Sequence, residues 1–329
     1  MVDLFTKLLK QSPKRSNQGF TLIELLVAMI IATIIITPLL GFMVNTLNRD
    51  RLEQTKTTSE AEIQSAIDYI AQDLEQAVYI YNADGVENAS TGTPRGIKDQ
   101  IPPAATPNST ICKETTKCFP VLVFWKRETV KDVLSISGIT KDSDDPDTTD
   151  DTFVYSLVAY YFIKDNTESG TWSDTARIGR FQIKDGVIDP NDPTTGTPPV
   201  PKYAAPISSG YQGFDLTLPG STLSDKMNQW TKKSDNYTDR VFTLIDYVDK
   251  NTTNSPIQNC PTNTQRVPSD TTIRGFYACV NSTNTLAQVY IRGNALARIN
   301  DNNSYNANNS AYFPSASVQV KGRGFLGVN

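Results

Sequence analysis

The sequence predicts an α+β fold in which one long N-terminal helix, with a membrane half and an amphipathic half, packs on a head of mostly antiparallel β-strands. Three observations predict this fold. Residues 20–44 are almost wholly apolar, residues 63–81 carry an apolar stripe at helical spacing, and β-type runs recur from residue 120 to residue 320. With 38% hydrophobic residues among 329, the chain can bury a substantial globular core.

The apolar segment Phe20 to Val44 contains a single ionisable residue and is long enough, at 1.5 Å per residue, to cross a hydrocarbon layer of roughly 30 Å. Four basic residues precede it within residues 1–19, so the positive-inside rule keeps that end cytoplasmic and exports the rest of the chain. A cleaved secretory signal needs small residues after the apolar run, and Asn45 and its successors do not provide them. A plain signal-anchor stays open as an alternative.

Glu24 is unusual because an unpaired carboxylate in an apolar segment costs at least a few kcal/mol and usually marks a specific partner. A cut between Gly19 and Phe20 would create an α-amino group four positions before Glu24, one helical turn away on the same face. The amine of this chain or of a neighbouring subunit could then pair with the carboxylate. The alternative is a glutamate that snorkels to the membrane interface.

The run from Lys14 to Leu26, KRSNQGFTLIELL, resembles the class III signal of type IV prepilins and of type II secretion pseudopilins. This resemblance implies that a prepilin peptidase cuts after Gly19 and methylates Phe20, and that Glu24 guides docking into a growing filament. Pro38 resembles the proline at which pilin helices kink or melt, since proline removes one helical hydrogen bond. The implied partners are the peptidase, other pilin or pseudopilin subunits, an inner-membrane assembly platform and the lipid bilayer.

Beyond the membrane, apolar residues from Ile63 to Tyr81 follow helical spacing, while acidic and amide residues such as Asp73 fill the other faces. We therefore expect four parts: a cytoplasmic leader at 1–19, a transmembrane and assembly helix at 20–46, an amphipathic helix docked on the head at 47–82, and an exported β-rich head with long loops at 83–329. Together with the resemblance, these parts give a pilin-like lollipop.

In the head, residues 82–119 are rich in Gly, Pro, Thr and Asn and predict a long loop, followed by β-type runs separated by polar insertions. The expected strands are 121–125, 132–137, 153–163, 177–183, 214–218, 241–248, 276–280, 286–291 and 317–320.

The four cysteines suit a zinc site poorly, because the gaps within Cys112–Cys118 and Cys260–Cys279 exceed the usual two to four residues. Two disulfides fit better and imply an oxidising compartment, in agreement with export. The local pairing of Cys112 with Cys118 and Cys260 with Cys279 is the most economical of three connectivities, and the other two stay open.

The composition argues against an enzyme. With no histidine, the chain lacks imidazole bases, Ser-His-Asp and Cys-His pairs, and histidine metal ligands. Asp246 and Asp249 are a weak candidate for paired catalytic carboxylates. No cofactor and no metal are expected, although the acidic segment 142–151 offers oxygen ligands suited to calcium as a minority interpretation.

The side chains of the head bear on two binding functions, the binding of sugars and the binding of nucleic acid. The aromatic residues Trp172, Tyr203, Tyr211 and Trp230 stand in loop-like contexts and could stack on sugar rings, although core packing explains them as well. Nucleic acid is not an expected partner, because the head is acidic overall and its basic clusters at 126–127 and 232–233 are short.

The size of the head resembles large minor pilins and J-type pseudopilins, and the texture of residues 37–42 and 68–80 is similar to cyanobacterial pseudopilins of hormogonium polysaccharide secretion. The resemblance implies a non-enzymatic subunit in the inner membrane, with its N-terminus cytoplasmic and its head periplasmic, which then joins a filament that supports polysaccharide secretion and gliding motility. The alternative is a filament-tip adhesin or carbohydrate-binding module.

Overall fold

The computed structural model describes residues 19–105, 112, 115–135, 149–164, 171–191, 194–197, 199–300 and 304–323. The chain divides into two compact units, residues 1–52 and residues 53–329. Among the described residues of the first unit, helix α1, Leu22–Glu75, is the only helix or strand, and it continues into the second unit.

Helix α1 ends at Glu75, so the prediction that it runs to about Tyr81 is wrong. Ala77–Ile80 instead forms strand β1, in which all four side chains are buried. A short apolar run of β-branched and aromatic residues fits a fully buried strand as well as a helical stripe, and the strand prevails because β1 pairs with β2.

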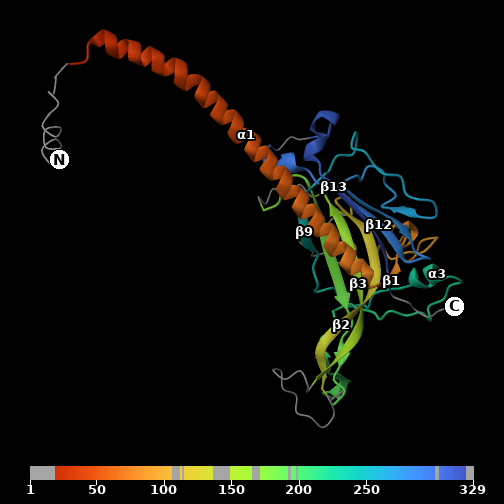
Figure 1. Cartoon of the computed structure of the whole chain (residues 1–329). Helices are drawn as coiled ribbons and strands as arrows, with labels where there is room; N and C mark the ends of the chain where they lie inside the picture. Colours follow the sequence, from red (N-terminus) through yellow and green to blue (C-terminus); the bar gives the residue numbers. More distant parts are fainter. Residues whose placement is uncertain are drawn as a thin grey trace, which may run out of the picture. The chain divides into compact units, whose positions relative to one another are not determined.

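The larger sheet has five strands in the order β1-β2-β3-β4-β9, and all its pairs are antiparallel. The bounds are β2 Cys118–Ser135, β3 Thr149–Ile163, β4 Ala176–Lys184 and β9 Phe242–Val248. The predicted strands 121–125 and 132–137 fall on one long strand, β2, as far as Ser135, and residues 136–137 lie outside the described residues. The register of β2 with β3 shifts between Val130 and Leu134. The far half of the β2–β3 hairpin extends away from the rest of the sheet (Figure 1).

The second sheet has four antiparallel strands in the order β10-β11-β12-β13. Their bounds are β10 Gln265–Val267, β11 Phe276–Asn281, β12 Leu286–Arg292 and β13 Ser315–Lys321. Two short pairs, β5 Val187–Ile188 with β8 Tyr203–Ala205 and β6 Thr194–Thr195 with β7 Val200–Pro201, stand apart from both sheets.

The remaining short elements lie in segments outside the predicted strands. They are α2 Ala83–Glu87, α3 Leu223–Met227 and the 3₁₀ helices η2 Ala295–Arg298 and η3 Ala307–Tyr312. The predicted strand 214–218 is wrong. Its Asp215 carboxylate accepts hydrogen bonds from the backbone N–H and the hydroxyl of Thr217, a local turn contact that competes with strand pairing.

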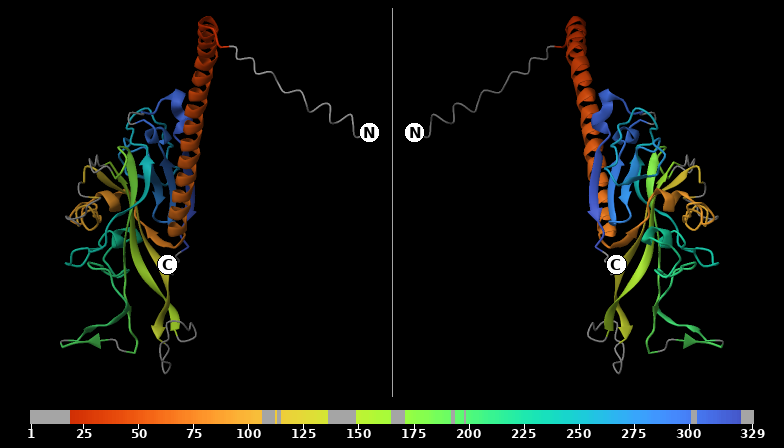
Figure 2. Two further views of the ribbon diagram at one scale, coloured as in Figure 1. Left: turned by 90° about the vertical axis from the view of Figure 1, so that its left-hand side faces the viewer. Right: turned by 90° about the vertical axis from the view of Figure 1, so that its right-hand side faces the viewer.

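One hydrophobic core joins the C-terminal half of α1 to both sheets. The buried face of α1 consists of Ile63, Ala66, Ile67, Ile70 and Leu74, and these side chains share a cluster with residues of all five strands of the larger sheet and with strands of the second sheet. From either side, this half of the helix runs along the head (Figure 2). The predicted α+β class, a long N-terminal helix followed by an antiparallel β head, is therefore confirmed.

Candidate processing and assembly site

The segment before helix α1 is where the sequence predicts processing. Gly19 and Phe20 precede the helix without secondary structure, and both are exposed. A Cβ atom added at Gly19 would meet no other atom within 4 Å, so packing does not require glycine there. An exposed, non-helical peptide next to a glycine is a suitable substrate for a protease, which must bind an extended backbone.

Glu24 lies in the first turn of α1 and takes part in its N-terminal cap. The Thr21 hydroxyl accepts a hydrogen bond from the Glu24 backbone N–H at 3.3 Å and donates to Glu24 Oε2 at 3.5 Å. The unpaired N–H groups of a helix N-terminus favour a nearby carboxylate. In the uncut chain Glu24 is thus stabilised by its own helix, and a cut after Gly19 would add the Phe20 amine next to this cap.

Helix α1 remains continuous through Pro38, which cannot donate a backbone hydrogen bond. Threonine hydroxyls of the same segment bond to carbonyls within the helix: Thr33 to Met29 O and Ile30 O, Thr37 to Thr33 O, and Thr46 to Phe42 O. These bonds satisfy hydroxyls that lipid could not satisfy. By length and apolar composition, α1 could span a membrane.

In the second unit, a cluster of charged side chains fixes α1 to the larger sheet; we call it the Asp73 clamp. The Asp73 carboxylate of α1 accepts hydrogen bonds from Lys126 Nζ of β2 at 3.0 Å, Arg180 Nε of β4 at 2.8 Å and the Tyr160 hydroxyl of β3 at 2.6 Å. Asp73 is 7% exposed. Three strands therefore converge on one buried carboxylate.

Two further residues complete the clamp. Lys126 Nζ also lies 2.8 Å from Glu128 Oε2, and Gln182 bridges Glu128 and Arg180 through its side-chain amide. Burial on its own would raise the pKa of Asp73 and of Glu128, but the cations and hydrogen bonds around them hold both pKa values below their ordinary range. Burial, together with the Asp73 charge, raises the pKa of Tyr160 well above its usual value.

The sequence alone did not predict this clamp. The helical pattern placed Asp73 on a face outside the apolar stripe, and Lys126 was noted only as part of a short basic cluster, whereas both side chains are buried. One signal was available, because Asp73 stands three positions after Ile70 and next to Leu74, at the edge of the apolar stripe. The partners on three strands could be found only from the sheet register.

Two of the four aromatic residues weighed for sugar stacking belong to the core, which confirms the core-packing alternative for them. Trp230 is 2% exposed, donates from Nε1 to Gln212 O and packs edge-to-face on Trp125 at 5.5 Å. Tyr211 is 1% exposed and donates to Tyr155 O. Trp172 and Tyr203 are half-buried.

The carboxylates that might have suggested catalysis have structural partners. Asp246 accepts from the backbone N–H and the hydroxyl of Ser173. Asp249 is fully buried, accepts from Asn251 and Ser255, and lies 3.6 Å from Arg292 Nη1. Most of the acidic segment 142–151 lies outside the described residues. Among the residues that the structure describes, no group of three or more potential ligands could hold a metal ion.

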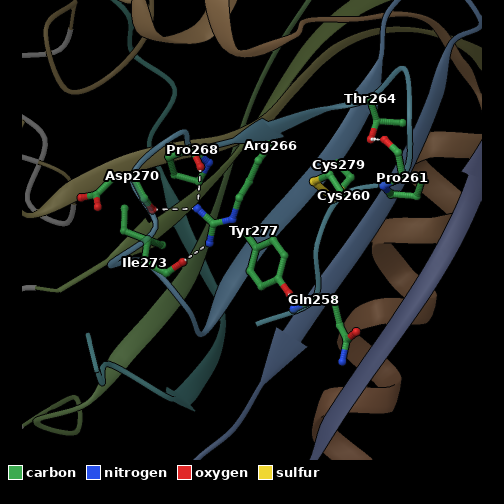
Figure 3. The surroundings of a disulfide bond; sticks show 10 residues. All are labelled: Gln258, Cys260, Pro261, Thr264, Arg266, Pro268, Asp270, Ile273, Tyr277 and Cys279. Carbon is green, nitrogen blue, oxygen red and sulfur yellow. Dashed lines mark hydrogen bonds between the residues drawn. A yellow bond between two sulfur atoms is a disulfide. The ribbon is translucent and has the colours of Figure 1, made fainter. Parts of the chain in front are cut away.

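The cysteines pair locally, as the sequence analysis favoured. Cys112 bonds to Cys118 and Cys260 to Cys279, with Cα–Cα distances of 5.5 and 5.4 Å. The second bond attaches the segment before β10 to the centre of β11 (Figure 3).

Residues 14–40 match the family model of the prokaryotic N-terminal methylation motif. The match supports a class III signal like that of type IV prepilins, a precursor processed by prepilin peptidase, and a structural subunit rather than an enzyme. No curated protein and no solved structure matches the chain.

Proposed function

We propose that this chain is a minor subunit of a type IV pilus-like or type II secretion-like filament, released from its leader by cleavage after Gly19 and methylated at Phe20. The observation that carries the proposal is the methylation-motif match over residues 14–40, combined with an exposed Gly19–Phe20 peptide that directly precedes a helix apolar enough to span a membrane.

Before assembly the protein resides in the inner membrane through residues 20–46, with residues 1–19 in the cytoplasm and the head in the periplasm. The assembly platform and neighbouring subunits are its partners. The bulk of a head that extends to residue 329 opposes close packing along a whole filament, which favours a low-copy tip or initiation subunit. The resemblance to J-type and hormogonium pseudopilins points to a role in polysaccharide secretion and gliding motility.

Glu24 acts in assembly rather than in folding. It belongs to the residue 1–52 unit, and its hydrogen bonds among the described residues are confined to its own helix turn. When an α-amino group at Phe20 of a neighbouring subunit approaches in lipid, the carboxylate is stabilised by pairing with it. This pairing sets the axial position of the incoming subunit.

Mass spectrometry of the N-terminal peptide, isolated from native membranes, tests the processing step. The expected chain begins at Phe20 with one added methyl group. Gly19→Val should abolish cleavage, while the matched control Gly41→Val should not, because an added Cβ meets nothing within 4 Å at either glycine. A wild-type chain that retains residues 1–19, or a Gly19→Val chain that is still cut, contradicts the proposal.

Filament incorporation tests the assembly step separately. Glu24→Gln should leave cleavage intact and reduce the amount of the chain in sheared filaments about tenfold, the effect of losing about 1.4 kcal/mol of pairing energy. Glu53→Gln, which changes an exposed carboxylate on the same helix, is the control. Equal incorporation of Glu24→Gln and the wild type would remove Glu24 from the mechanism.

A further inference from the structure

The outer face of the second sheet carries a row of stacked side chains, which we call the tyrosine ladder. Tyr277 of β11 and Tyr290 of β12 are directly paired in the register, and their rings are stacked with centroids 4.8 Å apart and an interplanar angle of 14°. The Arg266 guanidinium of β10 covers the other face of Tyr277 at 4.3 Å. On the β13 side, the residue opposite Tyr290 is Ser317.

The ladder therefore ends in a gap. Strands β10, β11 and β12 each contribute a flat side-chain group to the stack, whereas β13 contributes only Ser317. The small serine leaves room above β13, beside the face of the Tyr290 ring that points away from Tyr277. A pocket of about 470 Å³ occupies this region. Its floor includes Tyr290, Gln288, Ser315 and Ser317, which alternate with core-facing residues along β12 and β13.

Two walls close the pocket, and the Cys260–Cys279 disulfide holds one of them. Pro256 and Gln258 form this wall, and the Gln258 backbone N–H donates to the Tyr277 hydroxyl at 2.8 Å (Figure 3). The disulfide fixes the same segment to β11 two residues beyond Tyr277. The other wall is formed by Ser310 of η3, by Tyr305 before this helix and by Phe313 after it.

The charge of the lining is opposite to the charge of the chain. Although the chain is acidic overall, the only charged side chains among the described lining residues are two arginines, Arg274 and Arg292. Arg292 lies 3.6 Å from the buried Asp249 carboxylate, which compensates its charge. The Arg274 side chain bonds to the Ser255 carbonyl, a neutral group, so its charge favours an anion in the pocket.

The neutral side chains of the lining distinguish between kinds of anion. Five of them, Gln258, Gln288, Ser310, Ser315 and Ser317, offer hydroxyl and amide groups that can both donate and accept hydrogen bonds. This set suits a ligand that has many hydroxyl groups on a flat, partly apolar ring. A pyranose ring stacks its C–H face on an aromatic ring and directs its hydroxyl groups sideways to such partners.

We propose that this pocket binds an acidic saccharide, a sugar unit that carries a carboxylate, with its ring stacked on the outer face of Tyr290 above Ser317 and its carboxylate toward Arg274. The site lies in the residue 53–329 unit, and none of its residues belongs to the processing segment. The inference therefore stands independently of the proposed assembly function.

Titration calorimetry of the full chain in detergent micelles tests the site, with oligogalacturonate as the probe. Neutral maltohexaose and poly-L-glutamate are the comparison ligands. Ser317→Tyr fills the gap in the ladder and should weaken oligogalacturonate binding at least about tenfold, and Tyr290→Ala should have a similar effect by removing the stacking surface. The matched controls are Gln319→Tyr, at the next exposed position of β13, and Tyr69→Ala, at an exposed tyrosine of α1 outside the pocket.

The proposal is supported if oligogalacturonate binds at least about tenfold more tightly than maltohexaose and only the two pocket variants lose it. Absence of oligogalacturonate binding to the wild type would overturn it, as would unchanged binding by a folded Ser317→Tyr chain. Equal binding of poly-L-glutamate would replace the saccharide by an acidic peptide. Cleavage after Gly19 can be measured on the same preparations, so failure of one proposal is distinguishable from failure of the other.

Discussion

Replacing Asp73 by asparagine should destabilise the head strongly, because it removes the one carboxylate on which three strands converge. The variant loses two charge-assisted hydrogen bonds, from Lys126 and Arg180, and weakens a third from Tyr160. It keeps the volume of the side chain, so cavity formation contributes little to the effect. The expected loss comes almost entirely from buried cations whose counter-charge has been removed.

The size of the loss in unfolding free energy depends on the partners that Lys126 and Arg180 keep in the variant. Removing one partner of a buried ion pair costs about 3–5 kcal/mol. Lys126 still has Glu128 at 2.8 Å and Arg180 still has the Gln182 amide, so the loss should lie at the lower end, about 3 kcal/mol. With a urea m-value of about 3 kcal/mol/M, the unfolding midpoint falls by about 1 M.

Tryptophan fluorescence during urea denaturation of the full chain in micelles measures this change. All three tryptophans, Trp125, Trp172 and Trp230, lie in the residue 53–329 unit and report its unfolding. Asp68→Asn is the matched control, since Asp68 is an exposed carboxylate on the same helix that accepts only a hydrogen bond from Gln64 among its described contacts. Its midpoint should stay within about 0.2 M of the wild type. A shift for Asp73→Asn no larger than that of the control would refute the clamp.

Three further perturbations follow from the same structure. Cys260→Ser with Cys279→Ser opens a loop with a sequence separation of 19 and should lower the unfolding free energy by about 3 kcal/mol, an effect that equal urea midpoints would rule out. Folding lowers the pKa values of Asp73 and Glu128, so as the pH falls the unfolded chain is protonated at these carboxylates before the folded chain is. The stability that the two carboxylates contribute should be complete above about pH 4.5 and decline as the pH falls through their folded pKa values. A free energy of unfolding that stays constant over this acid range would contradict the prediction. Pro38→Ala restores a backbone donor to the carbonyl four residues earlier and should slow amide exchange in that turn without moving the urea midpoint; exchange as fast as in the wild type would contradict this.

Much of the fold could be predicted from the sequence because hydrophobic periodicity determines the type of a long element. The apolar segment and the stripe up to Leu74 correctly predicted α1, and alternating runs predicted β11, β12 and β13. The prediction failed where a run is short. The apolar residues of Ala77–Ile80 fit the spacing of a helix as well as that of a buried strand. The segment forms a strand because it pairs with β2.

The two proposed functional sites also differ in how far the sequence could predict them. The processing segment is contiguous, so Gly19, Phe20 and Glu24 could be proposed from one short run, through its resemblance to prepilin signals and the four-residue distance from Phe20 to Glu24. The tyrosine ladder joins side chains from three strands spread over residues 266–290, and its order depends on the pairing of Tyr277 with Tyr290. Burial of Trp230 likewise depends on tertiary packing, since its own loop sequence looks polar.

The end of α1 is held to the head through its backbone as well as through Asp73. The Glu75 carbonyl accepts a hydrogen bond from Arg323 N, just beyond β13, and the Gln76 carbonyl accepts one from Arg127 N of β2. Carbonyls at a helix C-terminus otherwise lack partners, and here donors from β2 and from the segment after β13 supply them. The chain then enters β1 directly, at the edge of the larger sheet. Residues 73–77 therefore join α1 to β2, β3 and β4 and to the segment after β13, whereas Glu24 bonds within its own helix turn, so loss of Asp73 should loosen the head without altering the cap at Glu24.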